Sequence, residues 1–334
     1  MAEQRAASQH IVLDVHAHLI PVTGPLLDAF DGVAWDGKAS VLHVDGHAIG
    51  MKALFQPEAL LAWMEENRVG QAWISAPPPL YRQQLRGGEA HAWVEYINQG
   101  LDAIAARSES RLKALFHLPT QDPAIAASIA SQAIASGHFG FSMPTGTGDE
   151  RTLGDPAFEP LWAALNEARA FVFFHPGECA DGRLRSFYLT NLLGNPYESS
   201  VAIAHLIFAG VLERHSDIAM CFAHGGGLAP MLAGRWERGH ETARPGVDTT
   251  RQAPSQLLRG IYVDCICHSE AAAALAEETV GGSNVLFGSD WPFPMGLIEP
   301  HRQMQKFVPE RRNRYLADNP HRLLERIRKA RSES

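Results

Sequence analysis

The sequence lacks the features of membrane, secreted and nucleic-acid-binding proteins. It has no run of about 18 or more apolar residues, so we expect no segment that spans a membrane. Its first ten residues, MAEQRAASQH, contain no apolar core of the kind that secretory signals have. Basic residues are not in excess either. The formal net charge of −8 argues against nucleic acid or an anionic membrane surface as a partner.

Cysteine is also scarce, with four in 334 residues and no CxxC spacing. Two of the four, Cys265 and Cys267, alternate within the apolar stretch GIYVDCICH, which is typical of a buried strand. We therefore expect reduced core thiols in a cytoplasmic protein, and neither a disulfide framework nor a cysteine-based metal site.

What the sequence does contain is a regular alternation of strand-like and helix-like segments. Eight short β-rich runs recur, at residues 11–19, 71–77, 112–119, 140–144, 171–177, 219–227, 260–267 and 284–292. Amphipathic segments typical of helices follow them, at residues 57–69, 92–108, 124–137, 158–170, 199–215, 228–240, 270–282 and 310–330. This rhythm predicts a parallel sheet, and eight strand–helix pairs predict one (β/α)8 barrel, a TIM barrel, as a single domain over residues 1–334.

One segment does not fit the rhythm. Residues 21–56 separate the first strand from its helix and include a strand-like stretch, SVLHVDGH. Insertions at this point of a barrel lie on the side where active sites are built. We interpret the segment as an insertion that forms a lid or a dimer contact.

Polar side chains stand where several predicted strands end. His16 and His18 follow the apolar start of the first strand, and residues two apart share a strand face. His175 ends the fifth strand, His224 ends the sixth and Asp290 ends the eighth. Because barrel active sites are built from the carboxyl ends of the strands, we expect these five side chains to converge at the barrel mouth.

Three imidazoles and a carboxylate suit a divalent first-row metal, because they offer nitrogen and oxygen ligands. His16 and His18 would bind as a pair, His175 would add a third nitrogen, and Asp290 would add an oxygen or orient a metal-bound water. A metal would also satisfy these polar groups in an otherwise apolar strand. Asp14 has two interpretations: it hydrogen-bonds a metal ligand from behind, or it points to the bottom of the barrel and satisfies the backbone.

Further residues are weaker candidates for the pocket. His268 follows the seventh strand and is placed to line it. Trp291 and Phe293, in the stretch DWPFP, either wall the pocket or pack their own loop. His117 and His205 are expected at packing positions.

Together these residues resemble the amidohydrolase superfamily, and within it the branch that includes aminocarboxymuconate-semialdehyde decarboxylase. The similarity covers nearly the whole chain, through DVHAH, FFHPG, the stretch from NPYESS through AHGGG to RWERG, VLFGSDWPFPMG and YLADNPHRLL. The resemblance implies a mononuclear site, usually zinc, with His16, His18, His175 and Asp290 as ligands. The fourth strand, GFSMPTG, lacks the lysine that bridges two metals in other members, which favours one metal.

The resemblance also implies roles around the metal. The catalytic histidine of the branch falls on His224, as general base or proton shuttle. An arginine that reaches a substrate carboxylate from the neighbouring subunit falls on Arg235, which implies a homodimer. A second substrate arginine is missing, because its place reads GHAIGMKALFQPE, with Met51 and Lys52. Lysine does not reproduce a bidentate arginine clamp, so Lys52 departs from the pattern of the branch and the aminocarboxymuconate substrate is in doubt.

Arginines elsewhere are alternatives for the missing charge. Arg82, Arg183 and Arg185 lie in the loops after the second and fifth strands. Each of them is more typical of a solvated surface residue.

The sequence therefore predicts a metal-dependent enzyme that removes CO2 from a small unsaturated or aromatic carboxylic acid. It would use one divalent ion, zinc first, with manganese, cobalt or iron as alternatives. A hydrolase on the same site, acting on a lactone or on a carbon–carbon bond of a ring-cleavage product, is the alternative. A barrel that binds without turnover is disfavoured by the intact ligand set and His224.

Overall fold

The computed structural model describes residues 9–22, 27–177 and 179–332. The first eight residues, where we expected no signal segment, lie outside the described residues, as do residues 23–26 of the expected insertion.

Eight parallel strand positions form the framework and correspond to the eight predicted runs. They are β1 (Ile11–His18), β5 (Val69–Ser75), β6 (Leu112–Ala114) with β7 (Phe116–His117), β8 (Gly140–Pro144), β9 (Phe171–His175), β10 (Ala219–Phe222), β11 (Tyr262–Asp264) and β12 (Val285–Leu286). The third position is divided at Leu115, so β6 pairs with β5 and β7 pairs with β8.

The last strand closes onto the first. The backbone N–H of Val15 donates to the carbonyl of Phe287 at 3.0 Å, and that of Asp290 donates to the carbonyl of His16 at 2.7 Å. The remaining strands follow in chain order, as β1-β5-β6 and β7-β8-β9-β10-β11-β12. The predicted (β/α)8 barrel is thus confirmed, and the carboxyl ends of its strands share one rim.

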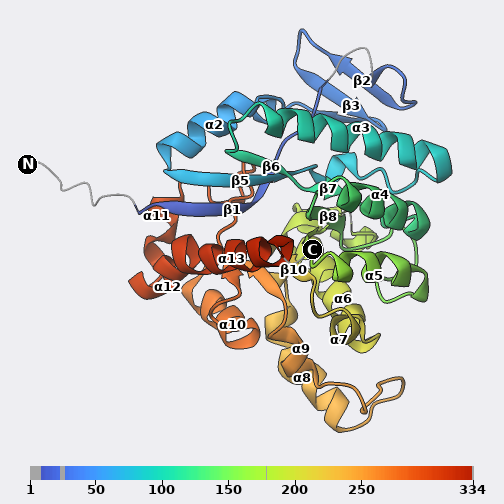
Figure 1. Ribbon diagram of the computed structural model, residues 1–334, viewed down its shortest axis with the longest axis vertical. Helices are drawn as coiled ribbons and strands as arrows, with labels where there is room; N and C mark the ends of the chain where they lie inside the picture. The colour runs from blue at the N-terminus through green and yellow to red at the C-terminus, as the bar shows by residue number, and fades with distance from the viewer. Residues whose placement is uncertain (1–8, 23–26, 178, 333–334) are drawn as a thin grey trace, which may run out of the picture.

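Helices surround the strands (Figure 1). The longer ones are α2 (Pro57–Glu66), α3 (Gly87–Ala106), α4 (Pro123–Ala135), α5 (Glu159–Glu167), α6 (Asn195–Phe208), α8 (Ala229–Glu241), α10 (Glu270–Val280) and α13 (Asn319–Ser332). Short helices α7 (Val211–Arg214), α9 (Pro254–Leu258), α11 (Pro300–Gln303) and α12 (Pro309–Asn313) complete the set. The predicted helix over 310–330 is instead α12 and α13, joined by a π-helical turn at Arg314–Asp318. Among the described residues, no helix combines the length and apolarity needed to cross a bilayer.

The barrel interior is a packed apolar core. Trp73, Leu115, Phe171 and Phe173 belong to one buried cluster with inward residues of the first, sixth and eighth strands, and α13 contributes to the same cluster. Burying each large side chain contributes roughly 1.5–3 kcal/mol. The polar groups at the barrel mouth therefore lie against a rigid apolar core.

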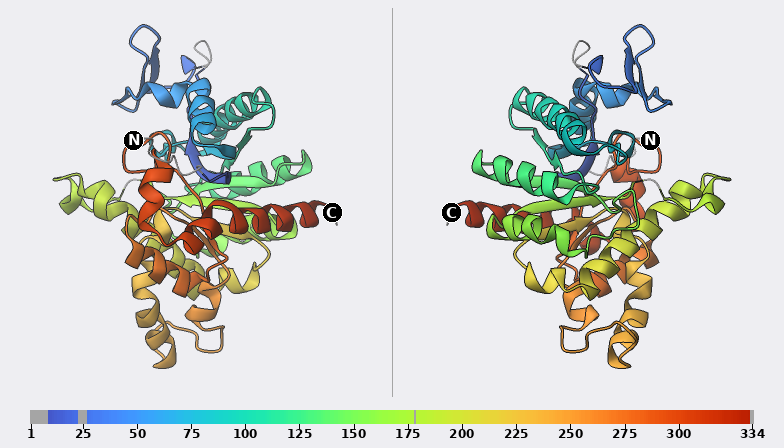
Figure 2. Two further views of the ribbon diagram at one scale, coloured as in Figure 1. Left: turned by 90° about the vertical axis from the view of Figure 1, so that its left-hand side faces the viewer. Right: turned by 90° about the vertical axis from the view of Figure 1, so that its right-hand side faces the viewer.

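The insertion carries a small antiparallel sheet of β2 (Val33–Asp36), β3 (Val41–Val44) and β4 (His47–Ile49), followed by a 3-10 turn at Lys52–Phe55. Figure 2 shows this sheet at one end of the molecule and α8 at the other. The expected insertion, including the strand-like stretch, is therefore present in the fold.

Arg82 fixes the inserted sheet to the barrel. Its guanidinium binds both carboxylate oxygens of Asp45 at 2.8 Å, donates to the carbonyl of Asp31, and lies 5.0 Å from the ring centroid of Trp93. The Arg82 side chain is only 5% exposed. Arg82 is thus neither a solvated surface residue nor free to hold a substrate carboxylate.

Replacing Arg82 with alanine should lower the free energy of unfolding by about 1–3 kcal/mol, because it leaves Asp45 without its partner and empties the space on Trp93. Urea denaturation followed by fluorescence measures the change. The matched control is Arg183→Ala, which removes an ion pair with Asp181 on the surface and should have little effect. Equal losses in the two variants would contradict the anchoring role of Arg82.

Candidate metal centre

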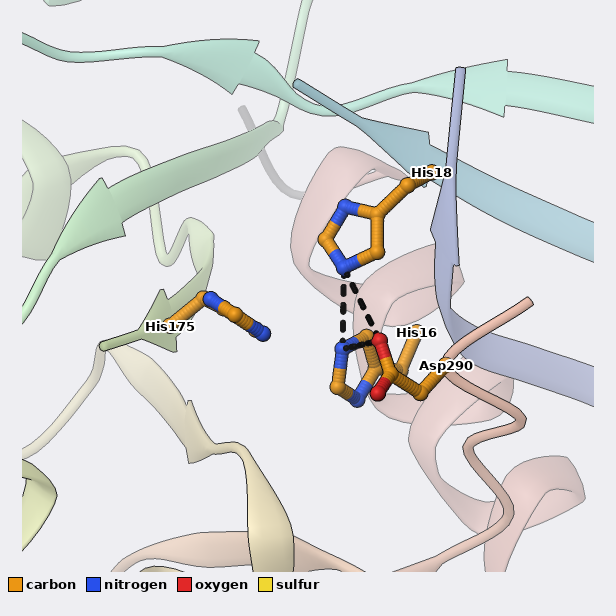
Figure 3. A group of neighbouring side chains, drawn as sticks. All are labelled: His16, His18, His175 and Asp290. Carbon is orange, nitrogen blue, oxygen red and sulfur yellow. Dashed lines mark hydrogen bonds and ion pairs between the residues drawn. The ribbon is translucent and has the colours of Figure 1, made fainter. Parts of the chain in front are cut away.

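Four buried side chains converge at the carboxyl-terminal mouth of the barrel: His16, His18, His175 and Asp290 (Figure 3). One potential ligand atom from each lies within 4.8 Å of the others. The Nε2 atoms of His16 and His18 are 3.1 Å apart, and Oδ1 of Asp290 lies 3.2 Å and 3.3 Å from them. The structure thus brings together the four residues that the sequence singled out as metal ligands.

A local irregularity of β1 aims its two histidines. The pairing of β1 with β5 shifts by one residue between Asp14 and Ala17, which is the mark of a β-bulge. Val15 lies in the inner apolar core, and yet His16 and His18 also face the barrel mouth. Strict alternation, which would place Asp14 with the two histidines, therefore does not hold along this strand.

Asp14 joins the first strand to the last. Its Oδ1 accepts hydrogen bonds from the backbone N–H groups of His16 at 3.0 Å and Ser289 at 2.9 Å, and Oδ2 accepts from the Ser289 hydroxyl at 2.5 Å. Burial raises the pKa of Asp14 to about 6, against the effect of these hydrogen bonds. Of its two interpretations, satisfaction of the backbone is the one that matches these contacts.

The Nδ1 atom of each histidine in the cluster is already engaged. That of His16 lies 2.7 Å from Oδ2 of Asp264, that of His18 lies 3.2 Å from the Ser75 hydroxyl, and that of His175 lies 2.9 Å from the carbonyl of Pro176. Hydrogen bonds at Nδ1 leave Nε2 as the free nitrogen, which is how proteins orient metal-binding imidazoles.

Asp264 contacts the cluster and was not singled out by the sequence analysis. It ends β11, and its Oδ1 also accepts from the backbone N–H groups of Gly225 and Ile266, both at 3.0 Å. It therefore holds both the His16 ring and the turn after His224. A carboxylate within the apolar run GIYVDCIC was the available signal, by the same logic that selected Asp290.

The electrostatics of the cluster suit a cation. Burial lowers the pKa of His18 and, with help from neighbouring imidazoles, that of His175. Burial acts in the same direction on His16, but Asp290 and Asp264 outweigh it and raise its pKa to about 10. Oδ1 of Asp290 is buried and has no hydrogen-bond partner among the described residues. Three nitrogens and this oxygen fit one divalent ion, which would replace the His16 proton as the positive charge.

His224 stands beside the cluster. Its Nε2 lies 3.8 Å from Oδ2 of Asp290, and its ring centroid lies 5.1 Å from that of His175. His224, Asp290 and His268 all have φ near +55°, which is rare for residues other than glycine and recurs at functional sites. After His224 the chain turns through three glycines, and a Cβ at Gly227 would collide with the backbone of Pro196.

Two cavities are lined by loops at the carboxyl ends of the strands. One of about 310 Å³ borders His224 and Asp290 and is lined mainly by apolar side chains, with His268 among its lining residues. A second, of about 1030 Å³, lies between the inserted sheet and the loops after β5, β8 and β9. Arg235 on α8 and Lys52 are exposed, and neither lines these two cavities.

The two aromatic candidates occupy different places. Trp291 is 4% exposed and packs in the core, and its carbonyl accepts from the N–H of His18 at 2.9 Å. The Phe293 ring centroid lies 5.5 Å from that of His18. Trp291 therefore packs its loop, whereas Phe293 borders the cluster.

Comparisons with known proteins agree with this architecture. The family model described as Amidohydrolase matches residues 13–326. A 2-amino-3-carboxymuconate-6-semialdehyde decarboxylase from Dictyostelium discoideum is 26% identical over 303 residues, which are 86% of this chain and 83% of that protein. One from Caenorhabditis elegans is 24% identical and covers 92% of both chains. The crystal structure of a 5-carboxyvanillate decarboxylase from Novosphingobium aromaticivorans, with bound manganese, has a TM-score of 0.78 at 17% identity and covers 96% of this chain and 98% of that one.

Replacing Asp264 with asparagine should weaken zinc binding by about 10- to 100-fold, because the amide lacks the charge that holds the His16 ring and its tautomer. Competition with a chromophoric chelator measures the affinity. Asp248→Asn, in an exposed loop, is the matched control and should bind zinc like the wild type. Unchanged affinity in Asp264→Asn would show that His16 does not need this partner.

Proposed function

The chain belongs to the amidohydrolase family, and from this premise we propose that it is a metal-dependent decarboxylase of an unsaturated or aromatic carboxylic acid. The observation that carries the proposal is the buried cluster of His16, His18, His175 and Asp290 with His224 beside it. The decarboxylases that match most of the chain support the reaction type. The donor set makes zinc our first choice of metal, with manganese, cobalt and iron as alternatives.

A bound divalent ion would act as a Lewis acid toward the substrate carboxylate and a neighbouring oxygen. Decarboxylation breaks the carbon–carbon bond to the carboxylate, leaves its electron pair on the substrate carbon and requires a proton there. His224 would deliver this proton from Nε2, which lies 3.8 Å from Oδ2 of Asp290. His268 and Phe293 would border the substrate.

Subunit association is part of the proposal. Arg235 is exposed on α8, and Met231, one turn earlier, is 75% exposed and lines the smaller cavity. Large exposed apolar side chains gather in the preceding segment, at Phe187, Tyr188, Leu192, Leu193 and Tyr197. We propose that this surface forms a homodimer and that Arg235 reaches a carboxylate in the partner's site. Lys52, in the 3-10 turn after the inserted sheet and outside both cavities, is a weaker candidate.

The insertion over residues 21–56 is proposed to act as a lid. Val44, Asp45 and His47 line the larger cavity. This position favours a lid, and not a dimer contact, as the role of the insertion. We also propose that the chain is a single catalytic domain that works in the cytoplasm, where its four free cysteines would stay reduced.

Replacing His224 with alanine should reduce CO2 release by about 100- to 10,000-fold while leaving the metal content unchanged, because the imidazole moves a proton and is not a ligand. Mass spectrometry of the products of zinc-loaded enzyme with a panel of aromatic and unsaturated acids, lactones and ring-cleavage products measures the reaction. His91→Gln, on the exposed face of α3, is the control and should behave like the wild type. A lactone product heavier by one water, or two fragments whose summed mass exceeds that of the substrate by one water, without CO2, would instead establish the hydrolase alternative.

Mixing His224→Ala with Arg235→Ala subunits tests the shared site. If Arg235 acts across the dimer, random reassociation should restore about a quarter of wild-type activity, because half of the dimers are mixed and each of these holds one intact site. As the control, each variant is refolded separately, and the two are then mixed under conditions in which subunits do not exchange. Failure to recover activity in exchanged dimers would mean that Arg235 acts within its own chain or not at all.

A further inference from the structure

The larger cavity lies next to His175, although none of the four cluster residues lines it. Tyr81, Thr145 and Gly177 form part of its wall. Gly177 follows His175 by two residues, and the backbone N–H of Thr145 donates to the carbonyl of His175 at 3.1 Å. A molecule held at the cluster would therefore have this wall as its neighbour on the side of the second to fifth strands.

Tyr81 is held rigidly in this wall. One face of its ring stacks on the His117 ring, with centroids 5.0 Å apart and planes inclined by 10°. On Gly177, an added Cβ would lie 3.5 Å from the Tyr81 ring, so the glycine is in close contact with it. Tyr81 is 3% exposed and lines the cavity. Burial raises the pKa of Tyr81 well above its usual range, so the hydroxyl stays protonated and can donate.

Other polar groups on these strands are buried and unpaired. The hydroxyl of Thr145, whose residue is 4% exposed, has no partner among the described residues. The same holds for the Ser142 hydroxyl and for both ring nitrogens of His117, which lie opposite each other on β8 and β7. A buried polar group without a partner costs roughly 1–3 kcal/mol, and Thr145 lines the cavity, where a ligand could supply the partner of its hydroxyl.

The charges around the cavity limit what that ligand carries. Acidic and basic side chains both line it: Asp45, Asp149, Glu150 and Glu198 against Arg82, Arg86 and Arg151. Arg82 is bound to Asp45, and Arg86 lies 3.9 Å from Asp149. Positive charge is therefore not in excess, and a second carboxylate would be poorly held here.

We propose that the larger cavity receives the part of the substrate that carries a neutral hydroxyl or carbonyl group, and that Tyr81 and Thr145 bind this group by hydrogen bonds. The proposal rests on the proposed function, in which the metal holds the carboxylate. It assigns the substrate to the hydroxylated or carbonyl-bearing monocarboxylic acids and away from the dicarboxylic acids. Tyr81 and Thr145 are thus specificity-determining residues, positioned by His117 and Gly177.

The test compares the binding of four probes to zinc-loaded enzyme by calorimetry: benzoate, 3-hydroxybenzoate, 4-hydroxybenzoate and the dicarboxylate isophthalate. We expect one hydroxybenzoate to bind about 3- to 10-fold more tightly than benzoate, as one additional neutral hydrogen bond allows. Tyr81→Phe, which keeps the stack on His117, should abolish this preference while leaving benzoate binding unchanged. Thr145→Val should reduce the preference, and isophthalate should bind no more tightly than benzoate.

Tyr315→Phe is the matched control. Tyr315 is also buried, and its own hydroxyl has no partner among the described residues, but it lines neither of the two cavities, so its loss should not change the preference. A preference that survives in Tyr81→Phe, the absence of any preference in the wild type, or tightest binding of isophthalate would each overturn the proposal.

A parallel CO2 assay separates the two proposals. Binding is read without turnover, so an enzyme that prefers a hydroxybenzoate through Tyr81 but releases no CO2 from any acid would contradict the decarboxylase function and leave the role of Tyr81 standing. Binding that does not depend on Tyr81, together with CO2 release from the acids, would support the decarboxylase function and contradict the role of Tyr81.

Discussion

The contact between Asp14 and Ser289 is the constraint on which the site depends. It ties the first strand of the barrel to the last, with one carboxylate oxygen shared between two backbone N–H groups and the other bound to a hydroxyl. His16 lies two residues after Asp14 and Asp290 lies one residue after Ser289, and the N–H of Asp290 donates to the carbonyl of His16. Barrel closure therefore brings His16 and Asp290, two of the four residues of the cluster, next to each other.

Closure of the barrel also explains how the site can hold buried charged groups and residues with strained backbone conformations. His16 sits between two carboxylates, Asp290 and Asp264, and the resulting attraction outweighs the cost of burying it. The left-handed backbone of His224 and Asp290 costs roughly 1–3 kcal/mol at each residue and persists only where packing enforces it. The apolar core around Phe173 holds this backbone in place, because a packed core does not relax to relieve strain in the residues above it.

The sequence predicted the barrel and the four cluster residues because both follow from short-range patterns. Apolar runs of strand length recur at a regular spacing, and a polar residue at the end of such a run is conspicuous. The orientation of Asp14 was harder to predict, because a one-residue bulge in β1 changes the strand face on which its side chain lies. Asp264 was overlooked among the cysteines of an apolar run. Tyr81 and Arg82 lie in a loop, and their surroundings come from strands and an insertion that are distant in sequence.

The two cavities divide recognition between different kinds of contact. The smaller one has no lysine or arginine among the described residues that line it, and the arginines of the larger one face an equal or greater number of carboxylates. A single chain therefore offers an anionic substrate little attraction apart from the metal itself. Charge selection would come from a bound metal or from a residue outside these walls. In the proposed dimer, exposed Arg235, one turn beyond Met231 of the smaller cavity, would provide it. In the proposed arrangement the metal and the partner would recognise the carboxylate, and the neutral hydroxyls of Tyr81 and Thr145 would recognise the rest of the molecule.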